Sequence, residues 1–148
     1  MTLARRIRVT GIVQGVGFRP FVWRLAGELG LSGWVRNDGE GVDIAAEGPA
    51  AALDTLLLRL RSEAPPLARI ESIAALDAPI HGHSSFIIAE SASPCGLPAR
   101  TSIGPDVATC PDCLTELFDP SGRRWRHAFI TCTHCGPRYT VTRHLPYD

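Results

Sequence analysis

Four cysteines stand in two close pairs, Cys110-Pro-Asp-Cys113 and Cys132-Thr-His-Cys135, with eighteen residues between the pairs. A C-x2-C turn places two sulfur atoms on one side of a tight loop, and two such turns complete a tetrahedron around Zn²⁺. Four thiolates leave no open coordination position. The spacing therefore predicts a structural zinc site, in which the metal also supplies folding energy.

Other uses of the cysteines are a redox C-x2-C motif or a pair of disulfides. A thioredoxin-type motif occurs singly and beside a βαβ pattern, which favours zinc. His127 or His134 could replace one cysteine as a ligand, but this is the less favoured case because four thiolates are available. Cys95 stands apart from the pairs, and we interpret it as a small side chain without a metal role.

The second stretch that could do chemistry is GIVQGVGFRP, from Gly11 to Pro20. It follows a strand-like run and precedes a helix-like one. A strand, a glycine-rich turn and a helix N-terminus together can bind phosphate, because backbone N–H groups converge on the anion and the helix dipole favours negative charge. The stretch is neither a Walker A loop nor a dinucleotide fingerprint, and taken alone it could be a simple connection.

Arg19 favours a phosphate site over a simple connection. An arginine at a helix N-terminus is electrostatically unfavourable unless an anion offsets its charge. Its guanidinium could turn back over the loop and bind phosphate oxygens in a bidentate manner. We therefore expect phosphate to be bound by Arg19 and by the backbone amides of Gln14, Gly15, Val16, Gly17 and Phe18.

The elements around the loop indicate an α+β domain over residues 1–90. Alternation predicts a strand at 6–12 with Ile7 and Val9 on its buried face. Apolar residues at helical spacing predict a helix that has Pro20 in its first turn and ends at Gly30. The remaining expected elements are strands at 34–37 and 42–47 around a hairpin turn, a helix from Pro49 to Pro65-Pro66, and strands at 70–76 and 85–88. This βαββαβ order is the ferredoxin-like pattern, with two helices on one face of an antiparallel sheet.

After Glu90 the sequence changes character, with many prolines and no helix-length periodic stripe. We expect an extended linker at 91–109, open to proteolysis, and a zinc module at 110–148. Inside the module, GRRWRHAF at 122–129 interleaves arginines with Trp125. That pattern could bind nucleic acid, but we favour a solvated loop whose aromatic side chain packs on the zinc core, because the chain has no excess positive charge.

Composition limits the partners and the compartment. The chain has 148 residues, 45% of them hydrophobic, with fifteen acidic and fifteen basic side chains and a net charge of zero. All of the basic residues are arginine, which suits anion binding. Neither a membrane-spanning run nor a signal peptide is visible, so we expect a cytoplasmic protein with no membrane or nucleic-acid partner.

The segment VQGVGFR, followed by a helix and then by GWVRNDGEGV, resembles the signature of acylphosphatases, small ferredoxin-like enzymes that hydrolyse carboxyl phosphates. The resemblance covers about residues 5–90. It implies that Arg19 binds the phosphoryl group together with the loop amides and that Asn37 orients the attacking water. From the local pattern alone, Asn37 could equally be a turn former at a strand end.

The acylphosphatase pattern followed by CPDCLTELFDPSGRRWRHAFITCTHCGPRYTV resembles the HypF family, the carbamoyltransferases of nickel–iron hydrogenase maturation. The resemblance implies hydrolysis of carbamoyl phosphate in this region. It further implies that later domains use ATP to form a carbamoyl adenylate and pass the carbamoyl group to the C-terminal cysteine of HypE, on the way to the cyanide ligands of the iron. The chain ends before those domains and before a second cysteine quartet, so we expect a fragment that performs hydrolysis and not transfer.

A function of another class also has to be considered. The ferredoxin-like sheet and the zinc knuckles could form a binding module for RNA or protein. An RNA-binding sheet of this kind displays exposed aromatic side chains on its central strands. The first strand, RIRVTGI, offers none, and this counts against an RNA-binding role.

Overall fold

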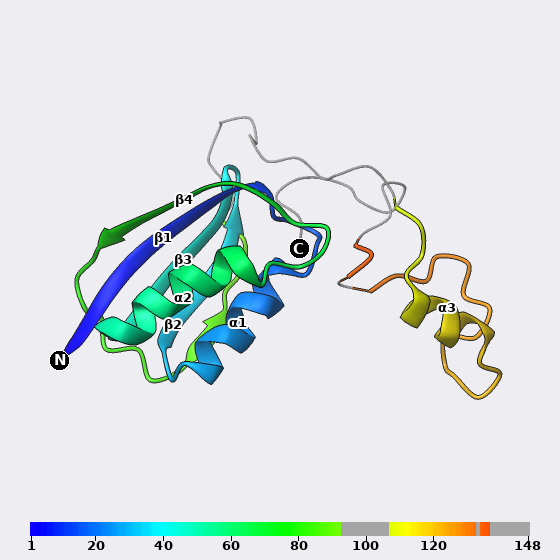
Figure 1. The fold of residues 1–148 in the computed structure, drawn as a ribbon. Coiled ribbons are helices and arrows are strands. Elements are labelled where there is room, and N and C mark those ends of the chain that lie inside the picture. The colour runs from blue at the N-terminus through cyan, green and yellow to red at the C-terminus, as the bar shows by residue number, and fades with distance from the viewer. Residues whose placement is uncertain (93–106, 133, 137–148) are drawn as a thin grey trace.

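The computed structural model describes residues 1–92, 107–132 and 134–136. Its first part is a five-stranded sheet with two helices on one face (Figure 1). The elements are β1 (Thr2–Ile12), α1 (Phe18–Glu28), β2 (Ser32–Asp38), β3 (Gly41–Pro49), α2 (Ala50–Ser62), β4 (Arg69–Asp77) and β5 (Phe86–Ile88). The α+β class and the βαββαβ order expected from the sequence are confirmed.

The strands lie in the order β4-β1-β3-β2-β5. The first four are antiparallel, with Ile7 opposite Ile44 and Val35 opposite Ile44 on the other side. β5 pairs with β2 in parallel, Phe86 facing Gly33, so the sheet is mixed and not wholly antiparallel as we expected. β2 and β4 run in opposite directions, and after β4 the chain turns back, so β5 runs opposite to β4 and therefore parallel to β2.

The core lies between the sheet and the two helices. Ile7 and Val9 of β1 are fully buried and alternate with more exposed Arg6 and Arg8, as the sequence pattern predicted. The helices cover this face with Phe21, Val22, Leu25, Leu53, Leu56 and Leu60, all buried. Burying each aliphatic or aromatic side chain contributes about 1.5–3 kcal/mol, so this layer supplies most of the stability of the first part.

Both predicted helices are present, with small shifts at their ends. α1 begins at Phe18, so Pro20 lies in its first turn, as expected. Pro49 is the N-cap of α2, and that helix ends at Ser62, ahead of the Pro65-Pro66 pair. A proline is tolerated in both places because the first backbone N–H groups of a helix have no intrahelical acceptor.

The second described part, residues 107–136 without 133, contains a helix that the sequence pattern did not predict. α3 (Pro111–Phe118) begins directly after Cys110, with Pro111 in its first turn. Its only buried residue is Cys113, while Leu114 and Phe118 are exposed. Its inward face consists of Cys113 and half-buried Leu117, four residues apart, and this is too short for a helix-length periodic stripe.

The expected linker at 91–109 falls mostly on residues 93–106, which lie outside the described residues, as does Cys95. The chain follows β2 as far as Ala92, whose backbone N–H donates to the Asn37 carbonyl at 2.9 Å. At the other end, Val107 packs against the cysteine cluster. The boundaries at 90 and 110 and the protease sensitivity between them stay predictions.

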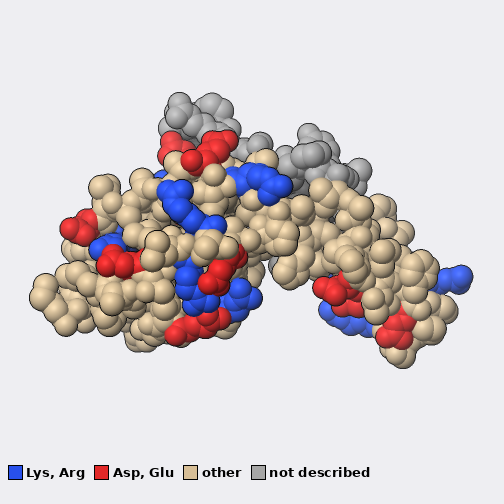
Figure 2. Space-filling view, viewed as in Figure 1, with Lys and Arg blue, Asp and Glu red and all other residues tan. Residues whose placement is uncertain are grey.

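Charges of both signs are interspersed over the described residues on the face shown in Figure 2. Ion pairs such as Arg59 with Glu28 and Glu63, each at 2.7 Å, link the ends of neighbouring helices on the surface. Within the described residues, no helix is long and apolar enough to span a membrane.

Candidate active site and metal centre

The glycine loop between β1 and α1 adopts a conformation that requires its glycines. Gly15 and Gly17 have φ values of 70° and 79°, in the left-handed region that other L residues rarely adopt. Gly17 is also the N-cap of α1, and no side chain caps that end of the helix. The first turn contains no acidic residue either. The loop therefore leads into a helix N-terminus whose backbone donors suit an anion.

Arg19 is the second residue of α1 and is half-buried. The structure thus places its positive charge at the positive end of the helix dipole, as the sequence indicated. An anion bound by the loop would offset both charges at once.

Gln14 has a role that the sequence pattern did not reveal. Its side chain is buried, and its amide nitrogen donates to the carbonyl oxygens of Asp38 at 2.7 Å and Gly41 at 2.8 Å. The side chain therefore joins the glycine loop to the hairpin between β2 and β3. The Gln14 backbone N–H remains among the amides expected to bind phosphate, whereas its side chain positions the hairpin relative to the loop.

Asn37 lies within β2 and is 1% exposed. It shares the buried face of the strand with Val35, directly opposite Val42 of β3. The turn that follows is built by Asp38, whose carboxylate accepts from the backbone N–H groups of Glu40 at 2.8 Å and Gly41 at 3.1 Å. Because Asp38 supplies the turn, a turn-forming role does not account for Asn37.

The hairpin end that carries Asn37 is held firmly against the glycine loop. Asp38 also pairs with Arg8 of β1, and the Gln14 side chain bonds to the backbone on both sides of the turn. In Figure 1 the β2–β3 hairpin and the C-terminal end of β1 lie at the same end of the sheet. The fold thus brings the loop, the start of α1 and the end of β2 that carries Asn37 to one end of the sheet.

The four cysteines converge as their spacing predicted. The sulfur atoms of Cys110, Cys113, Cys132 and Cys135 all lie within 4.8 Å of one another. The distances are 3.6 Å from Cys110 to Cys132 and 3.9 Å from Cys135 to both Cys113 and Cys132. A Zn–S bond of about 2.3 Å implies edges of about 3.8 Å in a regular tetrahedron. The donor set therefore fits a structural Zn²⁺, and the distances are far too long for disulfides.

The electrostatics of the cluster also call for a cation. Burial, together with the neighbouring sulfur atoms, raises the pKa of the Cys113 thiol well above its usual value. Burial also opposes ionisation of Cys135, but hydrogen bonds from Thr131 and from backbone N–H groups outweigh it and lower its pKa to about 6. Four converging thiols can all ionise only when a metal ion compensates their charge.

The remaining candidate residues of the module lie outside the cluster of sulfur atoms. His127 and His134 are not part of that cluster, so the cysteine-only ligand set is favoured over a mixed one. In the 122–129 loop, Arg124 bonds to Glu116 at 3.1 Å and to the Thr131 carbonyl at 3.0 Å. Trp125 is 47% exposed and has the Arg126 guanidinium 5.2 Å from its ring centre.

The sheet face away from the helices bears on the RNA-binding alternative. Its aromatic side chain is Trp34 of β2, and the guanidinium groups of Arg6 and Arg36 lie 4.7 and 4.6 Å from the ring centre. Both arginines also bond to the buried carboxylate of Asp43. Because the protein's own side chains occupy the ring face, Trp34 is not presented as a platform for a base.

Comparison with known proteins assigns both parts of the chain. A family described as acylphosphatase matches residues 5–88, and one described as the HypF finger matches residues 109–142. Carbamoyltransferase HypF2 of Cupriavidus necator is 61% identical, over 99% of this chain and 18% of its own length. An acylphosphatase of Rhizorhabdus wittichii is 46% identical, over 52% of this chain and 78% of its own length.

A crystal structure of full-length HypF in a phosphate- and nucleotide-bound form superposes with a TM-score of 0.91 at 38% identity, covering 100% of this chain and 19% of that one. The chain thus spans less than a fifth of the length of the carbamoyltransferases that it matches. Through residues 5–88 the chain belongs to the acylphosphatase family, and with its HypF finger it matches the N-terminal region of the HypF carbamoyltransferases.

Proposed function

We propose that this chain hydrolyses an acyl phosphate at the end of the sheet where the glycine loop, the start of α1 and Asn37 meet. The observation that carries the proposal is the loop conformation, with Gly15 and Gly17 in the left-handed region ahead of an uncapped helix that has Arg19 in its first turn. Loop amides and the guanidinium would bind the three phosphoryl oxygens.

The chemistry needs little beyond positioning. A water molecule attacks phosphorus, the bond from phosphorus to the acyl oxygen breaks, and the carboxylate leaves with the electron pair. A carboxylate is a good leaving group, so charge stabilisation by Arg19 and the amides would lower the barrier without a strong base. The Asn37 amide would hold the water, because an amide can accept and donate hydrogen bonds without titrating.

The finer proposal is that the acyl phosphate is carbamoyl phosphate. Its support is the similarity to HypF carbamoyltransferases along the whole chain, including the finger. Hydrolysis would release carbamate and phosphate. The full-length protein would then serve nickel–iron hydrogenase maturation by carbamoylating its partner HypE, with this region supplying the first step. A second C-x2-C quartet within about fifty residues downstream in the reading frame would support this assignment.

Steady-state kinetics with carbamoyl phosphate and acetyl phosphate, without added metal, test the proposal. Arg19→Ala should raise KM and lower kcat, and Arg19→Lys should also be poor because an ammonium cannot reproduce the guanidinium fork. Asn37→Ala should lower kcat by roughly 10²-fold or more, the scale for losing one positioning hydrogen bond, while phosphate affinity changes little. Inorganic phosphate should inhibit competitively.

A matched control is Arg61→Ala, which removes an exposed guanidinium from α2 on the same domain and should leave both parameters unchanged. Full turnover in Asn37→Ala would show that the water-orienting role is wrong. Full turnover in Arg19→Ala as well would mean that the glycine loop is only a connection.

A further inference from the structure

The second C-x2-C turn contacts the glycine loop, although more than a hundred residues separate the two in the sequence. We call this turn, Cys132 and residues 134–136, the knuckle. Gly136, the residue after the last cysteine, is buried and has a φ of 76°. A Cβ built on Gly136 would lie 2.5 Å from the carbonyl oxygen of Gly15. Only a residue without a side chain can approach the loop this closely.

The contact acts on one particular peptide group. A trans peptide is planar, and its carbonyl oxygen and the following N–H point in opposite directions. A knuckle that packs against the Gly15 oxygen therefore fixes the direction of the Val16 N–H, which points away from Gly136. Val16 N–H is one of the loop donors assigned to phosphate above. The knuckle thus supports the loop from the side opposite to the anion.

The position of Gly136 depends in turn on the metal turn. Its backbone N–H donates to the Cys132 carbonyl at 2.8 Å, and the Thr131 hydroxyl donates to its carbonyl oxygen. These bonds close the same short ring that carries Cys132 and Cys135. When the two sulfur atoms bind one ion, the ring is fixed, and Gly136 is fixed with it.

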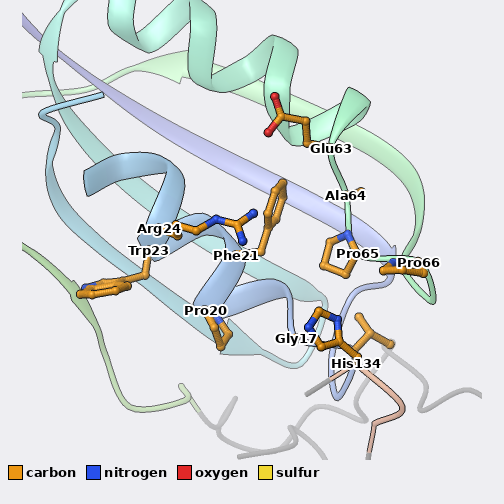
Figure 3. A pocket seen from close by; sticks show the side chains of 11 residues that line it. Gly17, Pro20, Phe21, Trp23, Arg24, Glu63, Ala64, Pro65, Pro66 and His134 are labelled. Carbon is orange, nitrogen blue, oxygen red and sulfur yellow. The ribbon is translucent and has the colours of Figure 1, made fainter. Parts of the chain in front are cut away.

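The two parts also line a common cavity. A cavity of about 400 Å³ lies between the knuckle, the start of α1 and the end of α2, and Figure 3 shows the residues that line it. His134 of the knuckle shares this cavity with Gly17 and with the Pro65-Pro66 pair that follows α2. His134 therefore borders the same cavity as the start of α1 and the Pro65-Pro66 pair.

We propose that the zinc knuckle is a positioning element of the phosphate site, so that zinc binding at Cys110, Cys113, Cys132 and Cys135 raises the affinity of the glycine loop for phosphate. The proposal rests on the function proposed above and adds a coupling between the phosphate site and the zinc site. Coupling between two sites is reciprocal, so phosphate should also strengthen zinc binding.

The test compares two glycines with the same backbone conformation. Gly136→Ala places a methyl group against the Gly15 oxygen, whereas Gly82 has a φ of 74° and open space around its would-be Cβ, so Gly82→Ala carries the same strain without the contact. With zinc content measured, Gly136→Ala should raise the Kd for inorganic phosphate about fivefold or more in calorimetry, the lower end of typical coupling. Gly82→Ala should leave it unchanged. Removing zinc from the wild type with a chelator should also raise this Kd.

A second pair covers the case in which Gly136→Ala loses its zinc. Thr131→Val removes the hydroxyl that bonds to Gly136, and Thr115→Val removes a comparable bond, from the Thr115 hydroxyl to the Pro111 carbonyl at 3.0 Å, in α3. Thr131→Val should weaken phosphate binding and speed hydrogen exchange at the Val16 amide, and Thr115→Val should do neither. Unchanged phosphate affinity in zinc-loaded Gly136→Ala, or in zinc-loaded Thr131→Val if the first variant loses metal, overturns the coupling while leaving the hydrolase proposal standing. No phosphate binding by the wild type overturns both.

Discussion

The two described parts of this chain obtain their order from different sources. In residues 1–92, four long strands and two helices enclose a continuous layer of buried aliphatic and aromatic side chains. In residues 107–136, without 133, the buried cluster consists of Cys113, Ile130 and Cys135, and two of these are proposed metal ligands. Larger apolar side chains of this part, Leu114, Phe118 and Phe129 among them, stay exposed.

The comparison shows that a metal can replace the folding free energy that a hydrophobic layer supplies elsewhere. A helix of eight residues is unstable alone in water, because nucleating a helix costs more than so few hydrogen bonds return. Among its described residues, the finger offers α3 only a small cluster around Ile130 and the cysteines, so bonds to zinc must supply most of that free energy. The first part needs no such help, and its loop and strand ends are free to serve an anion.

The largest expected effect separates the two parts by removing the metal. Chelation, or Cys113→Ser, should unfold the described finger, because structural zinc contributes about 10–16 kcal/mol in small zinc domains. Amide exchange followed by NMR should show loss of protection throughout α3, while strands β1 to β4 remain protected. Metal analysis of protein purified without chelator should give one zinc per chain. A fully folded finger in metal-free protein would contradict the comparison.

The converse change should act on the first part alone. Leu56→Ala removes a fully buried side chain of α2 and should lower the free energy of unfolding by about 2–5 kcal/mol, from lost burial and the remaining cavity. Zinc stoichiometry should not change. Leu58→Ala on the same helix is the matched control, because Leu58 is 71% exposed, and its cost should stay within about 0.5 kcal/mol. Urea unfolding with a zinc-sensitive dye distinguishes the two outcomes.

The contrast also explains how much the sequence alone could predict. Elements that bury a periodic face could be found: the alternation around Ile7 and Val9 marks β1, and the spacing of Leu53, Leu56 and Leu60 marks α2. The cysteine cluster could be found because its ligand spacing is a local property. α3 could not, because its inward face, Cys113 and Leu117, is too short to give a helix-length apolar stripe.

Long-range positioning was beyond the sequence pattern as well. Nothing in the spacing of Gln14 tells that its side chain bonds to the backbone of Asp38 and Gly41, since that pairing depends on how the hairpin docks. The parallel pairing of β5 depends on a three-residue strand at the far edge of the sheet. The approach of Gly136 to Gly15 joins two parts that the sequence suggested were separated by a linker.

A smaller effect on stability is expected at Glu47, a buried charged group that holds a connection of the first part by hydrogen bonds instead of hydrophobic contact. Glu47 of β3 is 4% exposed, and its carboxylate accepts from the backbone N–H groups of His81 at 2.7 Å, Gly82 at 3.0 Å and His83 at 3.2 Å. Burial alone would raise its pKa, but these donors outweigh burial and lower the pKa below the ordinary value of 4.5. The carboxylate thereby holds the connection from β4 to β5.

Glu47→Gln should therefore destabilise the protein by about 1–3 kcal/mol at pH 7, the range for weakening hydrogen bonds to a buried charged group. A lowered folded-state pKa stabilises the fold above the unfolded-state pKa, and this contribution is lost as pH falls through the folded-state pKa. The difference between wild type and variant should thus shrink below about pH 4.5. Urea unfolding from pH 7 to pH 3 measures it, with exposed Glu71→Gln as the control. A difference that grows on acidification would contradict the assignment.

The smallest expected effect is on zinc affinity in the finger, where the surface residue Arg124 links segments that share little hydrophobic contact. Arg124 bonds to Glu116 of α3 and to the Thr131 carbonyl beside the second knuckle, so it ties the two halves of the finger together. Arg124→Ala should weaken zinc binding by only about two- to fivefold, because exposed ion pairs contribute about 0.2–1 kcal/mol. Arg123→Ala is the matched control, since the neighbouring side chain is exposed and should not affect zinc. Competition with a chelator of known affinity measures both.

Because both arginines carry the same charge, a nucleic-acid role for the 122–129 loop predicts instead that both variants weaken binding to a single-stranded oligonucleotide while zinc affinity stays constant. A loss of zinc affinity confined to Arg124→Ala, with no oligonucleotide binding in the wild type, assigns this arginine to the folding of the finger.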